Sequence, residues 1–294
     1  MSLIKYLIIF LISFNAYAGD EEKLKKNIVE KFTSGFSSTI ENILDGEGDT
    51  KVQIDMGEDY HPEFSIVTVR PISKHHSNDA TFIQLQLNEQ KIRGEGRLSA
   101  NIGIGYRKLS ESKDSITGAN VFVDYDEEGN ARASVGLELK SSSFELLANY
   151  YQAISGGQVV GAFTERTLDG QEVSAIGKVP FIPWADIVAT NYEWEADKNA
   201  ENKKGNKFSL EMQLTSNIKA AIGTDDNNLD ETTNFAKIMF VYPGVETDSA
   251  SDHLFSKKAF VQIDMSSELL SIVRRSNKQM IESEGTGVVM ARSN

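Results

Sequence analysis

The sequence contains no cysteine. Disulfide bonds and metal sites built from thiolates are therefore excluded, and the folded chain has to gain its stability by another route. Beyond the apolar run at residues 6–14, the sequence also lacks a hydrophobic stretch of the roughly 20 residues that a spanning helix requires. A helical membrane protein is thus excluded, and the chain is expected to be either soluble or a closed barrel.

Basic residues are in the minority, with 30 Lys and Arg against 43 Asp and Glu, which leaves a formal net charge of −13. This charge argues against nucleic acid as a partner. Four of the acids lie close together in the sequence, as a glycosidase pair would require: Asp124, Asp126, Glu127 and Glu128. Three of them fall in the expected turn "DEEGN", where acidic residues are commonly solvated, so we predict no catalysis there.

Other motifs for catalysis and metal binding are missing as well. No G-x-S-x-G motif occurs. The run "DDNNLDE" at residues 225–231 has no glycine at the sixth position, where the calcium loop of an EF-hand requires one. The four histidines all fall in expected loops: His61, His75, His76 and His253. We therefore predict no enzyme activity, no cofactor and no metal site.

The N-terminus has the pattern of a secretory signal. Lys5 precedes the apolar run, and the small-residue motif Ala16-Tyr17-Ala18 follows it. We predict a signal peptide over residues 1–18 that is cleaved after Ala18. In residues 19–49, apolar side chains recur every four positions, which predicts a short amphipathic helix in the periplasm.

From about residue 50 the period of the apolar residues becomes two, as in "NARASVGLELK" at residues 130–140. Turns rich in Gly, Asn and Asp separate the alternating segments. The segments lie at residues 63–72, 81–89, 98–108, 114–126, 130–140, 143–155, 169–179, 184–195, 207–214, 217–224, 233–242 and 256–264. We predict an all-β fold, a closed antiparallel up-and-down barrel of about 12 strands over residues 50–265.

The two faces of these strands differ in charge. The polar face carries the side chains that we expect to line the lumen: Arg107, Asp124, Arg132, Glu138, Glu145, Glu172, Lys178, Glu211 and Lys237. The apolar face includes many alanines, which are too small to fill the wide interior of a soluble barrel of this size. A transmembrane barrel in the outer membrane of a Gram-negative cell, with its apolar face toward lipid, is therefore favoured. A soluble periplasmic binding barrel, with that face inside, is the alternative.

Four stretches resemble successive strands of a known family: "SANIGIGYRKL", "ITGANVFVDYD", "RASVGLELKSSSFELLANYYQAISG" and "ERTLDGQEVSAIGKVPFIPWADI". The family is the inverse autotransporter β-domain, the translocation barrel of intimin and invasin adhesins. The resemblance extends over residues 50–281. In addition, "SIVRRSNKQMIE" at residues 271–282 is similar to the linker that follows the last strand in this family and lies in the pore.

The resemblance implies a twelve-stranded outer-membrane barrel with residues 266–294 as a linker or tail in the pore. It also implies the barrel-assembly machinery and periplasmic chaperones as partners during insertion. The extracellular modules and the lysin-motif domain of the adhesins have no counterpart in the sequence. We therefore expect a passenger-less barrel with a structural or residual translocation role, and a small porin-like diffusion channel is the alternative.

Overall fold

The structure, a computed structural model, describes residues 48–56, 62–72, 78–198, 201–242, 248–285 and 289–290. The signal peptide expected at residues 1–18 and the body of the helix expected over residues 19–49 lie outside these ranges. No helix in the described ranges is long and apolar enough to cross a membrane. The barrel strands are β1 (Thr50–Met56), β2 (Pro62–Pro71), β3 (Asp79–Ile92), β4 (Glu95–Leu109), β5 (Ser115–Asp126), β6 (Ala131–Ser141), β7 (Phe144–Ala153), β10 (Gly170–Val179), β11 (Ile182–Trp194), β12 (Lys203–Thr215), β13 (Ile218–Asn227) and β14 (Thr233–Tyr242).

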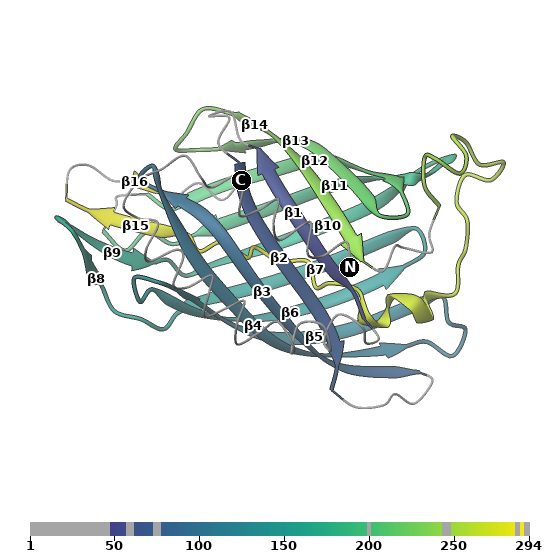
Figure 1. Cartoon of the computed structure of the whole chain (residues 1–294), viewed down its shortest axis with the longest axis horizontal. Helices are drawn as coiled ribbons and strands as arrows, with labels where there is room; N and C mark the ends of the chain where they lie inside the picture. Colours follow the sequence, from purple (N-terminus) through teal and green to yellow (C-terminus); the bar gives the residue numbers. More distant parts are fainter. Residues whose placement is uncertain are drawn as a thin grey trace, which may run out of the picture. The chain divides into compact units, whose positions relative to one another are not determined.

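These twelve strands form a closed barrel in the order β1-β14-β13-β12-β11-β10-β7-β6-β5-β4-β3-β2 (Figure 1). Every pair of neighbours is antiparallel, and β1 closes the barrel by pairing with both β14 and β2. The prediction of an all-β, closed antiparallel barrel of about 12 strands is confirmed. A second, four-stranded sheet has the order β16-β15-β9-β8 and consists of β8 (Gln158–Val160), β9 (Phe163–Thr167), β15 (Ile281–Glu284) and β16 (Val289–Met290).

One strand is not where the sequence predicted it. Residues 256–264 are not a strand, so that expectation is wrong, and the twelfth strand is β1 instead. Because β1 occupies the edge of β14, residues 256–264 have no barrel edge left to pair with. They run irregularly from the β10–β11 turn, where Ser256 N donates to Phe181 O at 2.8 Å, to the short 3-10 helix η1 (Met265–Leu270).

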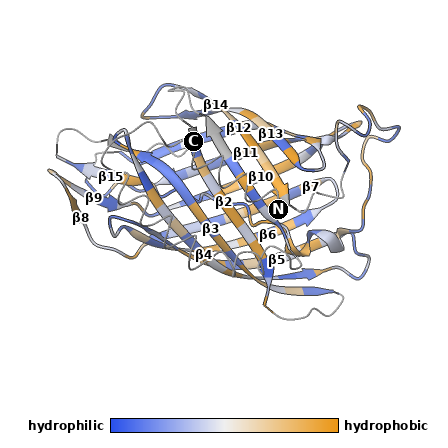
Figure 2. Cartoon of the chain, in the orientation of Figure 1, coloured by the Kyte–Doolittle hydropathy of each residue, from blue (hydrophilic) through white to orange (hydrophobic). Residues whose placement is uncertain are grey.

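Side chains alternate between the two faces of the barrel wall, so that apolar and polar residues follow one another along the strands (Figure 2). On the outside, Val121 and Val135 are each 55% exposed and Leu137 is 66% exposed. On the inside, Asp124 and Arg132 are completely buried. The aliphatic rows therefore face outward and the ions inward, as in a membrane barrel and opposite to a soluble one. The alternative of a soluble barrel with its aliphatic rows inside is wrong.

Two inward-facing glycines of β4 make room for phenylalanines. A β-carbon at Gly105 would lie 2.2 Å from the ring of Phe82, and one at Gly103 would lie 2.3 Å from the ring of Phe122. Any larger residue at either position would push the phenylalanine out of place. With glycine at both positions, the two rings form a buried apolar cluster with Met265, Leu269 and Leu270 of η1. This cluster lies at one end of the barrel interior.

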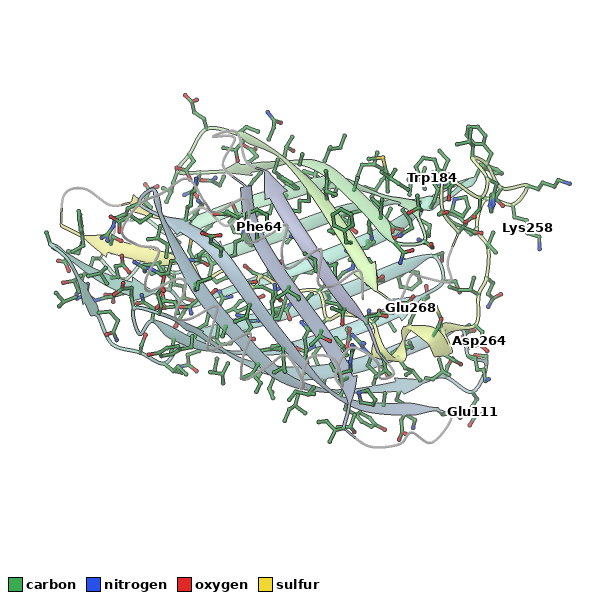
Figure 3. All side chains as sticks on the ribbon, viewed as in Figure 1. Phe64, Glu111, Trp184, Lys258, Asp264 and Glu268 are labelled. Atoms are coloured by element: carbon green, nitrogen blue, oxygen red, sulfur yellow. The ribbon has the colours of Figure 1, made fainter. Side chains whose placement is uncertain are left out.

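The connections at the two ends of the barrel differ in length. At one end, β6 and β7, β10 and β11, and β12 and β13 are each joined by only two residues. At the other end, β3 and β4 are also joined by two residues, but β11 and β12 are joined by residues 195–202 and β7 and β10 by residues 154–169, which include β8 and β9. We refer to these as the short-turn end and the long-loop end. Figure 3 labels Asp264 and Glu268, which mark the position of η1 at the short-turn end.

Candidate functional site

Residues 271–280, which we call the lumen segment, cross the inside of the barrel from η1 to β15 (Figure 1). They belong to no strand or helix. Polar side chains of the barrel nevertheless bind the backbone of this segment on two sides, and odd-numbered and even-numbered residues turn to opposite sides. This alternation is the geometry of an extended chain, in which the amides of successive residues point in opposite directions.

The odd-numbered residues turn their backbone groups toward β3. The bonds run from Val273 N to Gln84 Oε1 (2.8 Å), from Asn88 Nδ2 to Asn277 O (3.3 Å), from Gln279 N to Gln90 Oε1 (3.0 Å) and from Gln90 Nε2 to Gln279 O (3.3 Å). In all of these bonds the two residues are 189 positions apart. The lumen segment therefore runs parallel to β3 and advances by the same distance per residue.

The even-numbered residues turn toward the opposite wall, formed by β6, β7 and the start of β10. The bonds run from Asn149 Nδ2 to Arg274 O (3.4 Å), from Ser276 N to Tyr151 Oη and to Glu172 Oε1 (2.8 Å each), from Arg132 Nη2 to Ser276 O (2.6 Å) and from Leu168 N to Met280 O (2.9 Å). Barrel side chains, together with the backbone N–H of Leu168 just before β10, thus take the place of the neighbouring strands that an extended chain has in a sheet. Such bonding satisfies backbone groups that would otherwise be buried and unpaired.

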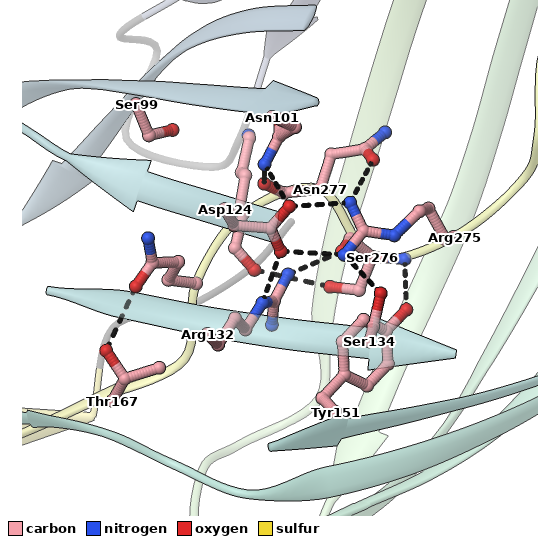
Figure 4. Close-up of polar contacts among 12 residues, drawn as sticks. Ser99, Asn101, Asp124, Arg132, Ser134, Tyr151, Thr167, Arg275, Ser276 and Asn277 are labelled. Carbon is pink, nitrogen blue, oxygen red and sulfur yellow. Dashed lines mark hydrogen bonds and ion pairs between the residues drawn. The ribbon is translucent and has the colours of Figure 1, made fainter. Parts of the chain in front are cut away.

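Asp124 is the centre of the charged contacts in the lumen (Figure 4). Its two carboxylate oxygens accept from Arg275 of the lumen segment at 2.9 and 2.7 Å, and Arg132 Nε donates to Oδ2 at 2.6 Å. The side chains of all three residues are completely buried. The two guanidinium groups also lie over aromatic rings, Arg275 over Phe122 at 4.5 Å and Arg132 over Tyr151 at 4.4 Å. Paired, charge-assisted hydrogen bonds of this kind are among the strongest in proteins.

Arg107 connects the barrel wall to the end of η1. It donates from Nε and Nη2 to the two carboxylate oxygens of Glu138, at 2.7 and 3.0 Å, and from Nη1 to Leu269 O at 3.1 Å. In the other direction, Arg274 of the lumen segment reaches across the barrel to Glu211 on β12, with 3.0 Å to each carboxylate oxygen. Its Nε lies 3.5 Å from Glu145 on β7.

Apolar clusters hold both ends of the lumen segment. At the short-turn end, Val273 and the apolar side chains of η1 pack on buried residues of β2 to β5, including Phe82 and Phe122. At the long-loop end, Met280 packs against Trp194 and three other buried residues: Tyr151, Leu168 and Tyr192. The segment is therefore anchored by hydrophobic contacts at its ends and by polar contacts between them.

The lumen segment does not fill the barrel. A cavity of about 420 Å³ remains beside it, along the wall formed by β1 and β10 to β14. Pairs of opposite charge line this wall, such as Lys178 with Asp186 at 2.9 Å and Lys219 with Glu211 at 2.6 Å. Asp49, which directly precedes β1, and Glu268 of η1 border the cavity. Burial and the nearby Glu268 carboxylate raise the pKa of Asp49 to about 6.

The structure places the nine side chains that we expect to line the lumen as follows. Five are buried inside the barrel: Arg107, Asp124, Arg132, Glu138 and Glu172. Four line the cavity: Glu145, Lys178, Glu211 and Lys237. Six of the nine contact η1 or the lumen segment: Arg107, Asp124, Arg132, Glu145, Glu172 and Glu211. Glu138 forms an ion pair with Arg107, which in turn binds η1, whereas Lys178 forms an ion pair with Asp186 within the wall.

Sequence reasoning missed the neutral side chains that bind the lumen segment, chiefly Gln84, Asn88 and Gln90 of β3. A signal for them exists, because "QLQLNEQ" at residues 84–90 carries an amide at every second position. Tyr151, Arg274 and Arg275 were missed as well, although the last two lie in the stretch that resembles the family linker. In the part of the chain that the structure describes, no group of three or more His, Asp or Glu side chains is placed to hold a metal ion.

Among solved structures, one from work on the mechanism behind the in-meso crystallization of membrane proteins has a TM-score of 0.62 and 18% sequence identity. It covers 80% of this chain and 100% of its own, and it shows the same fold. Two porins also match. The KdgM porin in complex with disordered oligogalacturonate has a TM-score of 0.45 and 6% identity, and the NanC porin 0.43 and 12%; each match covers 65% of this chain and 98% of the porin.

No curated protein sequence matches the chain. A family model described as "Inverse autotransporter, beta-domain" matches residues 11–277, which is most of the sequence. The resemblance found in the strand sequences is therefore confirmed. The protein belongs to the inverse autotransporter β-domain family and is an outer-membrane β-barrel.

Proposed function

We propose that this protein is a translocation-type barrel whose pore is occupied by its own C-terminal segment. The observation that carries the proposal is the engagement of the lumen segment on both sides, through backbone bonds to β3 and to β6, β7 and β10. A barrel built only for the diffusion of small solutes does not need side chains that bind a polypeptide backbone. The proposed role is to hold a polypeptide in the pore, and it involves no catalysis.

The course of the segment supports an outward direction for the polypeptide. Outer-membrane barrels have short periplasmic turns and longer extracellular loops. On this rule the lumen segment enters from the periplasm at η1 and leaves at the long-loop end, where β15 pairs with β9. The N-terminal segment 1–18 would then direct export and be cleaved after Ala18. The barrel-assembly machinery and periplasmic chaperones would act during insertion, and the outward aliphatic rows would contact outer-membrane lipid.

A diffusion channel is the second candidate, and the cavity of about 420 Å³ beside the lumen segment favours it. Its charged wall is of the kind that water and ions can wet. If the cavity continued through both ends of the barrel, ions would pass with the segment in place. The buried cluster around Met280 and Trp194 at the long-loop end argues against such a continuous path.

Conductance in a planar bilayer tests the two candidates. We expect the full-length protein to be closed to steady ion flow and a variant that lacks residues 266–294 to conduct. A gel run with and without boiling controls for folding, because a folded barrel migrates differently from an unfolded one. Steady current through the full-length protein would contradict the occupied pore and support the diffusion channel.

A further inference from the structure

The inward side of β3 carries four amide side chains in succession. Gln84, Gln86, Asn88 and Gln90 occupy every second position, and each is at most 7% exposed. Three of them bind the lumen segment, and in the described structure these bonds all go to backbone atoms of the segment. We call these three residues, Gln84, Asn88 and Gln90, the amide ladder.

Backbone amides are the same in every residue except proline, so a site that binds only backbone atoms does not distinguish sequences. The same principle operates when a peptide adds to a sheet edge, where main-chain bonds supply affinity without specificity. Since the amide ladder and the lumen segment have the same repeat of two residues, a shift of the segment by two residues would bring equivalent groups to each position. A shift by one residue would turn those groups away.

The four inward-facing amide side chains of β3 also have unused bonding capacity. Gln86 faces residue 275 in the register of the segment, yet its Nε2 donates to Asn88 instead. Its Oε1 and the Nε2 of Gln84 are buried and have no hydrogen-bond partner in the described structure. An unpaired buried amide destabilises a protein, so a site fitted to one fixed chain would be expected to pair these atoms. Spare donors and acceptors suit a site that binds a chain in more than one register.

Specific recognition of the segment comes from its side chains. Arg275 pairs with Asp124, Arg274 pairs with Glu211, and Met280 fills the apolar cluster at the long-loop end. These contacts depend on which residue stands at which position. They select one register among those that the amide ladder allows.

We propose that Gln84, Asn88 and Gln90 form a binding site for the main chain of an extended polypeptide, one that accepts any sequence and accepts registers two residues apart. Arg274 and Arg275 select the register of the protein's own segment. The inference rests on the proposed function, because the ligand is the polypeptide that occupies the pore.

Proline substitution in the full-length protein tests whether the amide ladder binds the main chain of the segment. Val273→Pro removes the N–H that Gln84 accepts, whereas Asn277→Pro leaves the carbonyl that Asn88 binds. We expect Val273→Pro to raise the open fraction of single channels about tenfold, as the loss of one buried hydrogen bond would. Asn277→Pro and the side-chain control Val273→Ala should change it less. Equal open fractions for Val273→Pro and Val273→Ala would overturn the inference.

An exchange of residues tests the register. In one variant the pairs Ile272-Val273 and Arg274-Arg275 exchange places, which moves both arginines by two positions. In a matched variant, Val273→Arg with Arg275→Val, the arginine pair moves by only one position, and the composition is unchanged. The first should be open less often than the second, since a slide of two residues restores both the ladder bonds and the pairs with Asp124 and Glu211, whereas a slide in either variant moves Met280 out of the apolar cluster. The second should be open about ten times as often. Equal open fractions in the two variants would contradict the proposal that the site accepts registers two residues apart.

The two proposals fail in different ways. If a variant without residues 266–294 conducts but the proline and exchange variants behave like their controls, the segment blocks the pore without main-chain recognition. If the full-length protein conducts steadily, the occupied pore itself is wrong. Migration of each variant before and after boiling is the control that tests whether its barrel is folded.

Discussion

The two walls of the lumen differ in how they use polar side chains. The wall from β3 to β7 binds the lumen segment through buried amides and through Asp124 and Arg132, all nearly inaccessible to solvent. The wall from β10 to β14 and β1 borders the cavity and pairs its lysines with acids of neighbouring strands, as Lys178 does with Asp186. The first wall makes most of its polar contacts with the polypeptide, whereas the second makes most of its ion pairs within the wall.

This difference indicates that the wall from β3 to β7 makes most of the contacts with the segment, on both sides of its backbone. Its contacts with the cavity wall are the ion pair of Arg274 with Glu211, the bond from Ser276 N to Glu172 and the packing of Met280 on Trp194. Because the free volume lies on that side, the segment can leave the β3–β7 wall only toward the cavity. The contacts of the β3–β7 wall should therefore dominate the stability of the closed state, and the contacts of the cavity wall should have smaller effects.

Asp124→Ala should have the largest effect. It leaves Arg132 and Arg275 buried without their counter-charge, which destabilises a protein by about 3–5 kcal/mol. The measurement is the temperature at which the folded band disappears from an unboiled gel. On the cavity wall, Asp186→Ala leaves Lys178 and Lys219 next to a water-accessible cavity and should change stability by about 1 kcal/mol or less. Equal losses would remove the distinction between the walls.

The charged rows of the lumen could be predicted because alternation and charge are local properties of a strand, as at Asp124 and Arg132. The pair of Asp124 with Arg275 joins residues 151 positions apart, and no local pattern records it. The resemblance to a family linker placed residues 271–282 in the pore, but not their register. β1 was missed because its seven residues are too few for the alternation to stand out, and its place depends on pairing with β14 across almost the whole chain.

Gly105→Ala tests how tightly η1 packs on the β3–β7 wall at the short-turn end. The added β-carbon would meet the ring of Phe82 at 2.2 Å, so the ring and η1 beneath it have to move. Overpacking of this kind destabilises a protein by about 1–3 kcal/mol. Gly177→Ala is the control, because a β-carbon there has no neighbour within 4 Å in the described structure. Denaturant titration of the two variants in lipid vesicles measures the difference, and a stable Gly105→Ala would show that the packing of η1 is loose.

Glu211→Gln removes the main ion pair between the lumen segment and the cavity wall. Arg274 is 29% exposed and Glu211 is 15% exposed, so the pair is partly screened, and its loss should weaken the closed state by about 1 kcal/mol or less. The effect should shrink further at high salt. Open fractions of single channels at low and high salt check this. A larger rise in the open fraction than Asp124→Ala causes would mean that the cavity wall makes the stronger contacts with the segment.

Asp49, at the edge of the cavity, gives a defined pH dependence. Its pKa is about 6 in the folded protein against a usual value of 3.8, because burial and Glu268 disfavour the charged form. The folded state therefore binds more protons than the unfolded state between these values, and its stability falls as the pH rises from about 4 to about 6. Asp49→Asn should remove this contribution, so the difference in melting temperature between the two proteins should change across that range and level off above it. The opposite slope would mean that Asp49 is stabilised as a carboxylate by the cations of the cavity wall.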